Sequence, residues 1–450
     1  MNKKIYLLMV LLTFAIKVEA GVATGAAAVD YSASTAKQSQ AADDFKKPDW
    51  LGEVSVSVKV SYDSNVFLTN ADRVGFPKMA NVASWVTVLT PKIGVDFKPL
   101  LGLGKDDTSV QALAFSYAPD IVRYHEAATE NYENHRFIAQ IKGVADSFSY
   151  TLDSQSCLIN GNRNTPQYNQ VSAWATAVVR ERRDQFQEKG KLQLRNDWDS
   201  WFVRGVASTV YYDLNTEQYN PVGQHAGWQN YVDRYDANGG VDAGYKISRD
   251  FAATLGYRRG YQYQSAFSWN TASNSNEYNR VLIGFEGRPC AWLKMDMQAG
   301  PDFHEYDVSQ MQAGHAAAVT SFFADGKMTA EWTRNDALSC SIKQWQWVSS
   351  TGACTYEDKT FDFSYKHKFS SEWNAVLGYT IQGAVYNAPT VRSDWQYTYS
   401  AGLRYECNEH FSISADYAYS RGENESEISN LAPGREYDRH LVSLGLKAAF

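Results

Sequence analysis

The last nine residues of the chain, 442–450, read VSLGLKAAF. Apolar residues occupy every second position and end on an aromatic carboxy-terminal residue: Val442, Leu444, Leu446, Ala448 and Phe450. Because successive side chains of a β-strand point to opposite faces, this spacing predicts a strand with one apolar and one polar face. The last strand of a soluble β-sandwich could have the same pattern, so the rest of the chain has to distinguish a sandwich from other all-β folds.

The same period of two recurs from Leu51 onward. Residues 395–405 carry Trp, Tyr, Ala or Leu at odd positions and Gln, Thr, Ser, Gly or Arg at even ones. Segmentation at turn residues predicts about 18 strands, with 16 as the alternative. The predicted strands are 52–66, 82–98, 107–124, 132–143, 146–158, 180–197, 201–215, 231–247, 251–266, 277–288, 292–308, 319–332, 337–349, 358–369, 373–387, 394–407, 411–424 and 436–450.

The aromatic content favours a membrane setting. Phe, Tyr and Trp make up 14% of the chain, with 29 Tyr and 13 Trp. Such rings are favoured at membrane interfaces, where one end is apolar and the other is wet. The mean hydropathy of −0.44 and the lack of a later apolar run near 20 residues argue against a bundle of membrane helices. A closed β-barrel is the other structure that can cross a bilayer.

The turns agree with a barrel. Connections after even-numbered strands are mostly tight and polar, and those after odd-numbered strands are mostly longer, as in barrels with short periplasmic turns and long extracellular loops. Five aromatic residues begin predicted strands directly after short turns, as an interfacial girdle requires: Trp201, Phe251, Trp292, Trp373 and Trp395. The expected fold is therefore all-β, a transmembrane, antiparallel, up-and-down β-barrel over residues 50–450.

Residues 1–20 have the features of a secretory signal peptide. Lys3 and Lys4 give a positive start, residues 5–16 are apolar, and Val18-Glu19-Ala20 fits a cleavage site. An uncleaved anchor or a buried helix is the alternative. Removal of this segment, which carries three Lys and one Glu, changes the net charge from −7 to −9. That balance argues against a nucleic-acid partner.

Residues 21–49 are rich in Ala, Ser, Thr and Gln, and they contain too few large apolar residues to fold alone. We expect a flexible periplasmic segment there.

The five cysteines are few and odd in number, so they predict no disulfide framework. Cys157 and Cys354 are both expected near the extracellular ends of their strands. A single disulfide between them and two unpaired thiols are both consistent with the sequence.

No catalytic motif is present. The chain has no GxSxG, HExxH, CxxC or P-loop pattern, and its eight His residues are scattered. We expect no enzyme, no cofactor and no metal site. A barrel hydrolase that assembles Ser and His from separate connections is the alternative.

Charged residues recur on the polar positions of the predicted strands. A Lys or Arg facing lipid at mid-membrane costs about 2–4 kcal/mol, so these side chains should face the interior. The expected lining residues are Arg195, Arg204, Arg258, Arg280, Glu286, Arg288, Lys294, Asp296, Asp362, Lys366, Arg404 and Asp416, with Arg136, Lys142, Lys189, Lys191 and Glu406 as further positions. A basic excess would favour anionic solutes or acidic glycans. The alternative is an ion-pair lattice that braces the wall.

Several aromatic residues are predicted on inner or loop surfaces: Trp228, Tyr231, Tyr261, Tyr263, Trp345 and Trp347. They could stack on sugar rings, or they could pack connections against one another.

Residues 61–69, SYDSNVFLT, are followed by a loop and by a strand containing Thr90-Pro91. This combination resembles the β-barrel porin type 2 group, although Ser64 stands where that motif usually has Asp. The resemblance implies an outer-membrane channel, and some members are linked to exopolysaccharide systems. It brings no catalytic residue. We expect Asp63 and Asn65 to cap a turn or to bind loop backbone.

The expected function is therefore a channel in the bacterial outer membrane that passes polar solutes or an anionic polysaccharide. The alternative is a plugged structural or adhesive barrel that binds partners through its loops. The expected partners are outer-membrane lipid, polysaccharide, and the barrel-assembly machinery, which would recognise the carboxy-terminal strand.

Overall fold

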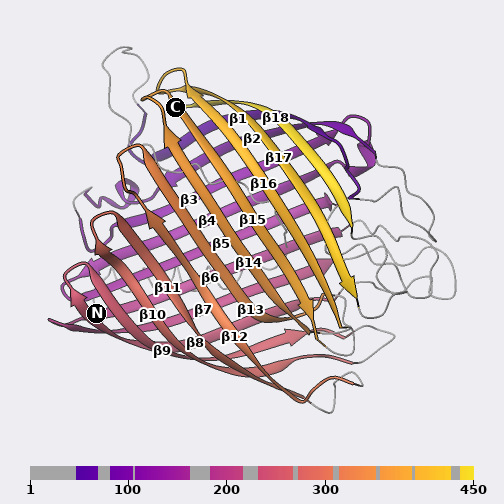
Figure 1. Ribbon diagram of the computed structural model, residues 1–450. Helices are drawn as coiled ribbons and strands as arrows, with labels where there is room; N and C mark the ends of the chain where they lie inside the picture. The colour runs from indigo at the N-terminus through magenta and orange to yellow at the C-terminus, as the bar shows by residue number, and fades with distance from the viewer. Residues whose placement is uncertain are drawn as a thin grey trace.

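The computed structural model describes residues 47–68, 82–104, 107–162, 183–215, 232–266, 272–307, 314–350, 355–387, 391–426 and 436–450. Within these ranges the chain forms eighteen β-strands and two short 3-10 turns (Figure 1). The predicted signal peptide, most of the segment 21–49 and most of the long connections lie outside the described residues. No helix within the described ranges is long and apolar enough to cross a membrane.

The strands are β1 (Leu51–Asp63), β2 (Ser84–Asp96), β3 (Ala112–Tyr124), β4 (Tyr132–Ala145), β5 (Phe148–Asn162), β6 (Arg183–Asp197), β7 (Trp201–Asn215), β8 (Arg234–Ser248), β9 (Phe251–Gln264), β10 (Asn276–Cys290), β11 (Leu293–Tyr306), β12 (Ala318–Ala330), β13 (Asp336–Val348), β14 (Thr355–Lys368), β15 (Trp373–Tyr386), β16 (Arg392–Glu406), β17 (Phe411–Ser426) and β18 (Tyr437–Ala449). The 3-10 turns are η1 (Pro99–Leu101) and η2 (Ala128–Glu130).

Each predicted strand corresponds to one observed strand. The largest error is at β3, which begins at Ala112 and not near residue 107. There the Asp107 carboxylate accepts a hydrogen bond from the Ser109 amide at 2.9 Å. Such a local side-chain bond offers the backbone an alternative to the strand ladder, so the strand starts later.

The sheet closes on itself. Every strand pairs antiparallel with its neighbours in sequence, and β1 pairs with β18 from Ser55↔Ala449 to Asp63↔Leu441. Closure leaves the barrel without an edge strand (Figure 1). The prediction of an all-β, antiparallel, up-and-down barrel is confirmed, with 18 strands and not 16.

Two residues of the motif that begins at Ser61 help to hold the β1–β18 seam. Asp63 binds the Arg439 guanidinium through both carboxylate oxygens, and it also accepts the Asn65 amide at 3.1 Å. The Asn65 side chain donates to the Asp438 carbonyl at 3.0 Å. Asp63 and Asn65 thus cap a turn and bind backbone, as expected from the sequence.

The two faces of the sheet differ sharply. On β18, Val442, Leu444 and Leu446 are 52–60% exposed, whereas Ser443 between them is buried. We call the exposed apolar side the outer face and the opposite side the inner face. Large aromatic residues ring one end of the outer face: Trp201, Trp292, Trp332, Trp373, Phe411 and Phe450. Trp395 instead lies near the start of β16, toward the opposite end.

We call the end with this aromatic ring the turn end, because connections such as 146–147, 249–250 and 369–372 close it tightly. They follow even-numbered strands, as predicted. The exception is 97–111, which contains η1. The opposite end is called the loop end.

Candidate functional site

The inner face carries eleven of the twelve residues expected to line the interior. Their strand positions pair with inner-facing neighbours and alternate with exposed apolar residues: Arg195, Arg204, Arg258, Arg280, Glu286, Lys294, Asp296, Asp362, Lys366, Arg404 and Asp416. The structure brings some of them together and leaves others apart. Lys59 on β1 reaches Asp416 on β17 at 3.4 Å, and Thr380 donates to Asp362 at 2.7 Å.

Arg288 is a correction to the sequence prediction. The β10–β11 register shifts between Gly287 and Cys290, and Gly287 has a φ of +106°. This bulge takes Arg288 out of the hydrogen-bonded ladder, because a β-bulge changes the direction in which the following side chain points. Arg288 is half-exposed at the turn end, where it lies 3.7 Å from the Glu331 carboxylate.

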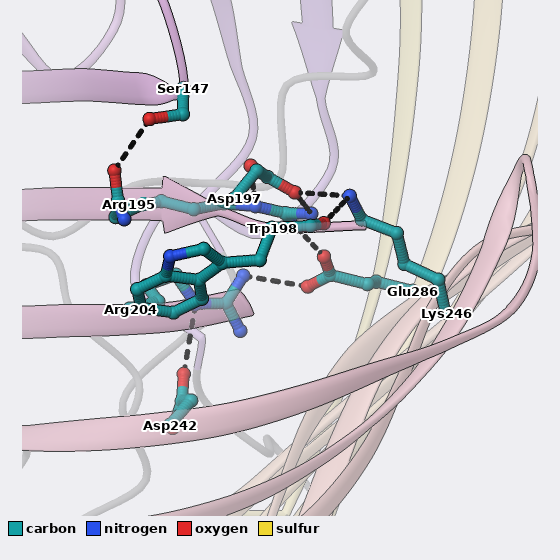
Figure 2. Close-up of polar contacts among 9 residues, drawn as sticks. Ser147, Arg195, Asp197, Trp198, Arg204, Asp242, Lys246 and Glu286 are labelled. Atoms are coloured by element: carbon teal, nitrogen blue, oxygen red, sulfur yellow. Dashed lines mark hydrogen bonds and ion pairs between the residues drawn. The ribbon is translucent and has the colours of Figure 1, made fainter. Parts of the chain in front are cut away.

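A network of seven charged side chains occupies the turn-end half of the interior, and all of them except Arg258 are labelled in Figure 2. We call it the turn-end network, and it consists of Arg195, Asp197, Arg204, Asp242, Lys246, Arg258 and Glu286. Glu286 lies 2.5 Å from Arg195 and 2.6 Å from Arg204. Asp242 lies 2.9 Å from Arg204 and 2.6 Å from Arg258. Charge-assisted bonds of this length are strong ones, so the network ties β6 to β10.

The pair between Arg195 and Glu286 crosses the concave inner face. Arg195 is on β6 and Glu286 is on β10, and three strands lie between them in the sheet. Arg195 rests on the buried Phe202 ring, 3.6 Å from its centroid. Gly244 makes room for that ring, since a Cβ there would lie 2.0 Å from the Phe202 Cζ atom. The two side chains therefore project into the interior and do not lie flat on the wall.

A second polar cluster is buried on the loop-end half of β8–β11. Arg280 lies 2.6 Å from Asp302, and the two side chains are 5% and 0% exposed. His304 lies 3.1 Å from the same carboxylate and 2.7 Å from the Asn276 side chain. Arg280 also stacks on the Phe323 ring at 3.7 Å. These side chains are more buried than Arg195, Arg204 and Glu286 of the turn-end network, although Arg280 also borders the cavity described below.

The end of β13 separates from β12 above this cluster, although it stays paired with β14 as far as Val348↔Thr355. Pairing between β12 and β13 runs from Ala330↔Leu338 only to Ala324↔Gln344, although β12 extends to Ala318. Residues 345–350, which we call the β13 end, instead contact β8 and β9. Arg234 donates to the Val348 carbonyl at 2.7 Å, and Gln262 donates to the Gln346 carbonyl at 2.8 Å.

Trp347 links the β13 end to both sides of the barrel. Its ring lies 6.1 Å from Tyr212 on β7, and the Arg234 guanidinium stacks on it at 5.0 Å. It also packs with Tyr356 on β14 and Tyr386 on β15. Tyr212 and Tyr132 continue the packing to buried residues of β2–β7. A layer of packed side chains thus crosses the interior near the loop end, and we call it the loop-end layer.

Open space lies on the turn-end side of this layer. One cavity of about 470 Å³ is lined by residues of β4–β13, including Lys191, Arg204, Glu286, Asp296 and Lys343. A second cavity, of about 370 Å³, lies against β1 and β15–β18 and is lined by Lys59, Arg404 and Asp416, among others. Within the described ranges, Lys189 and Lys191 have no carboxylate within ion-pair distance.

One carboxylate outside the strands has a shifted pKa. Glu126, in the connection after β3, accepts hydrogen bonds from the Ser84 hydroxyl at 2.8 Å and the Trp85 amide at 2.6 Å. These bonds favour the ionised form and hold the pKa of Glu126 below its usual value. The contact fastens this loop-end connection to the start of β2.

The structure agrees with some of the predictions for aromatic residues and contradicts others. Trp345 and Trp347 lie on the inner side, but placing Tyr261 and Tyr263 on an inner or loop surface was wrong. They alternate with the inner residues Gln262 and Gln264, so they lie on the outer face. Trp228, Tyr231 and Cys354 fall outside the described residues, so sugar stacking by the first two and the Cys157–Cys354 pair stay predictions.

Sequence reasoning missed the partners of the arginines. Asp197, Asp242, Asp302 and His304 all lie on inner positions but were not predicted. Period two could have found Asp302 and His304, which alternate with Pro301 and Phe303. No group of three or more His, Cys, Asp or Glu in the described ranges is arranged to hold a metal ion.

No family model matches the chain, and no curated protein matches it. Solved structures similar to it include the outer membrane protein OpdK of Pseudomonas aeruginosa, with 10% identity, 88% of this chain and 98% of that chain covered, and a TM-score of 0.40. OccAB3 of Acinetobacter baumannii has 9% identity, coverage of 88% and 99%, and a TM-score of 0.40. A mutant ferric enterobactin receptor of Pseudomonas aeruginosa, PfeA, has 8% identity, coverage of 89% and 82%, and a TM-score of 0.43.

Proposed function

We propose that this protein is a channel for small polar solutes in a bacterial outer membrane. The observation that carries the proposal is the combination of a closed barrel, an exposed apolar outer face and a charged inner face. An apolar outer face of this kind is stable against lipid, where a closed sheet satisfies all backbone hydrogen bonds. The polar inner face would then line a water-filled path.

The two halves of the interior together limit the size of the solute that could pass through the barrel. The cavities leave room for water and small molecules, whereas the loop-end layer places Trp347 and the buried Gln346 across the path. We therefore favour small polar solutes over a polymer. The sequence resemblance leaves polysaccharide as the other cargo, and its passage would require the β13 end to move.

The charge preference of the channel should be weak. The arginines of the turn-end network are matched by Asp197, Asp242 and Glu286, which supports the bracing lattice over a strong basic excess. Lys189, Lys191 and Lys343 add positive charge at the cavity, and Asp153, Asp296 and Asp325 add negative charge. Charges that neutralise each other have little effect on ion selectivity, so the unpaired charges determine it. We therefore expect a mild preference for anions.

Conductance in planar lipid bilayers tests this function. The purified full chain should give steady current steps, with a reversal potential in a salt gradient that indicates slight anion selectivity. Vesicles prepared without the protein are the control. A correctly folded, inserted barrel that gives no steps would contradict the channel.

A plugged surface barrel is the second candidate, and the loop-end layer is the observation that favours it. In that case the wild-type protein would not conduct, whereas a variant lacking the packing of Trp347 would. A variant that conducts while the wild type does not would show that the layer is a plug.

The last strand has a proposed role in assembly. Its apolar residues Val442, Leu444 and Leu446 lie on the outer face, and Phe450 is exposed. We propose that assembly machinery recognises this strand before the seam with β1 closes.

A further inference from the structure

Glu286 lies between two arginines. Its Oε1 atom accepts a hydrogen bond from the Arg195 Nη1 at 2.5 Å, and its Oε2 atom accepts one from the Arg204 Nη1 at 2.6 Å. Both oxygens of this one carboxylate are therefore used to neutralise guanidinium groups from β6 and β7 (Figure 2).

The two arginines have other partners that hold them in place. Arg195 also binds Asp197 through Nε at 2.8 Å and Nη2 at 3.0 Å. Arg204 also binds Asp242 through Nε at 2.9 Å. Loss of the Glu286 charge would therefore change the charge of the network more than its shape. The turn-end network has four cationic and three carboxylate groups, and without Glu286 it would have four and two.

These groups can act on a passing ion because they remain partly hydrated. Glu286, Arg204 and Arg195 are 19%, 16% and 25% exposed, and the first two line the larger cavity. Lys191 lines the same cavity, so further positive charge lies on its wall. An anion entering the cavity would meet guanidinium groups whose attraction Glu286 cancels.

We propose that Glu286 determines the charge selectivity of the barrel by keeping Arg195 and Arg204 from acting as an anion site. The inference rests on the proposed channel function and adds to it the residue that sets the ion class. Without Glu286, the two guanidinium groups would bind carboxylate or phosphate groups of small solutes, for which Arg geometry is suited.

Reversal potentials in a KCl gradient across planar bilayers test the proposal. Glu286→Gln should raise the chloride-to-potassium permeability ratio about sevenfold, because a unit charge at a separation of about 7 Å in water changes the energies of chloride and potassium by roughly RT each, in opposite directions. Arg204→Gln should shift the ratio in the opposite direction. If one of these two variants fails to fold, the other still tests the proposal, because each is expected to shift the permeability ratio by itself.

Glu277→Gln is the matched control. Glu277 is also on β10 and also pairs with an arginine, Arg259, at 2.6 Å, but it is exposed on the outer face. Its loss should leave the reversal potential unchanged. A conducting wild type whose reversal potential changes with neither Glu286→Gln nor Arg204→Gln would overturn the inference alone. A folded wild type without current would overturn the channel and the inference with it.

Discussion

The turn-end network and the β13 end share one interior but differ in hydration. Side chains of the network such as Arg195 and Arg204 keep 16–25% of their surface exposed. Residues 346–350 of the β13 end are almost fully buried. Arg195, Arg204 and Glu286 are partly exposed and meet one another, whereas a buried core forms where β13 separates from β12. We therefore expect ion selectivity to be set at the turn end of the interior, and the path to be narrowest near the loop end.

The largest effect should come from Trp347→Ala. This buried ring packs against Tyr212, Tyr356 and Tyr386 near the loop end. Loss of a buried Trp should lower the free energy of unfolding by about 3–5 kcal/mol. Urea titration in detergent micelles with tryptophan fluorescence measures the change. Trp345→Ala on the same strand is the control and should cost less, because that ring is only half-buried. Equal losses would mean that the loop-end layer is not a packed core.

Asp302→Asn should come next. It leaves the Arg280 guanidinium buried without a carboxylate, and breaking a buried pair costs about 3 kcal/mol or more. Glu286→Gln breaks contacts of similar length in the hydrated network, where water can replace the lost charge. It should cost less than Asp302→Asn in the same urea titration. If the two variants lose equal stability, the difference in hydration between the two regions is not real.

Arg234→Gln should loosen the β13 end. Arg234 donates to the Val348 carbonyl at 2.7 Å and to the Tyr356 hydroxyl at 3.1 Å, and both bonds are buried. Leaving such acceptors without a donor costs roughly 1–3 kcal/mol. Single-channel conductance should rise, because the β13 end would then occupy the path for less of the time. A stable variant with unchanged conductance would place the narrowing elsewhere.

The smallest effect should be that of Arg259→Gln. Its pair with Glu277 is exposed on the outer face, and exposed pairs contribute below about 1 kcal/mol. Neither stability nor conductance should change beyond that amount. A larger loss would mean that this part of the outer face is covered in the folded protein.

The barrel was predictable from the sequence because its signal is local. Alternation in segments such as 395–405 depends on neighbouring residues only, and turn residues between segments set the strand count. The ends of the strands were less predictable where side chains compete with the ladder, as Asp107 does before β3. The closing register between β1 and β18 involves the motif at 61–69, but its Arg439 partner lies too far along the chain to be read from it.

The interior was predictable only in part. Alternation placed Arg204 and Glu286 on one face, but it could not pair Glu286 with Arg195, which is 91 residues away with three strands in between. Asp242 was missed because β8 reads DANGGVDAG around it, and Gly and Ala fit either face. The β13 end alternates like every other strand. Its separation from β12 and its contacts with Arg234 and Gln262 are visible only in the structure.

Cysteine labelling along β16 tests the central claim, which is that the apolar face meets lipid and the opposite face encloses water. Residues 398–403 would be replaced by Cys one at a time, in a background without the native cysteines, and reconstituted in lipid vesicles. A charged, membrane-impermeant thiol reagent should label Thr398→Cys, Ser400→Cys and Gly402→Cys, because the native residues occupy inner positions of β16. It should spare Tyr399→Cys, Ala401→Cys and Leu403→Cys. Labelling of both sets alike, or of the second set only, would contradict the account.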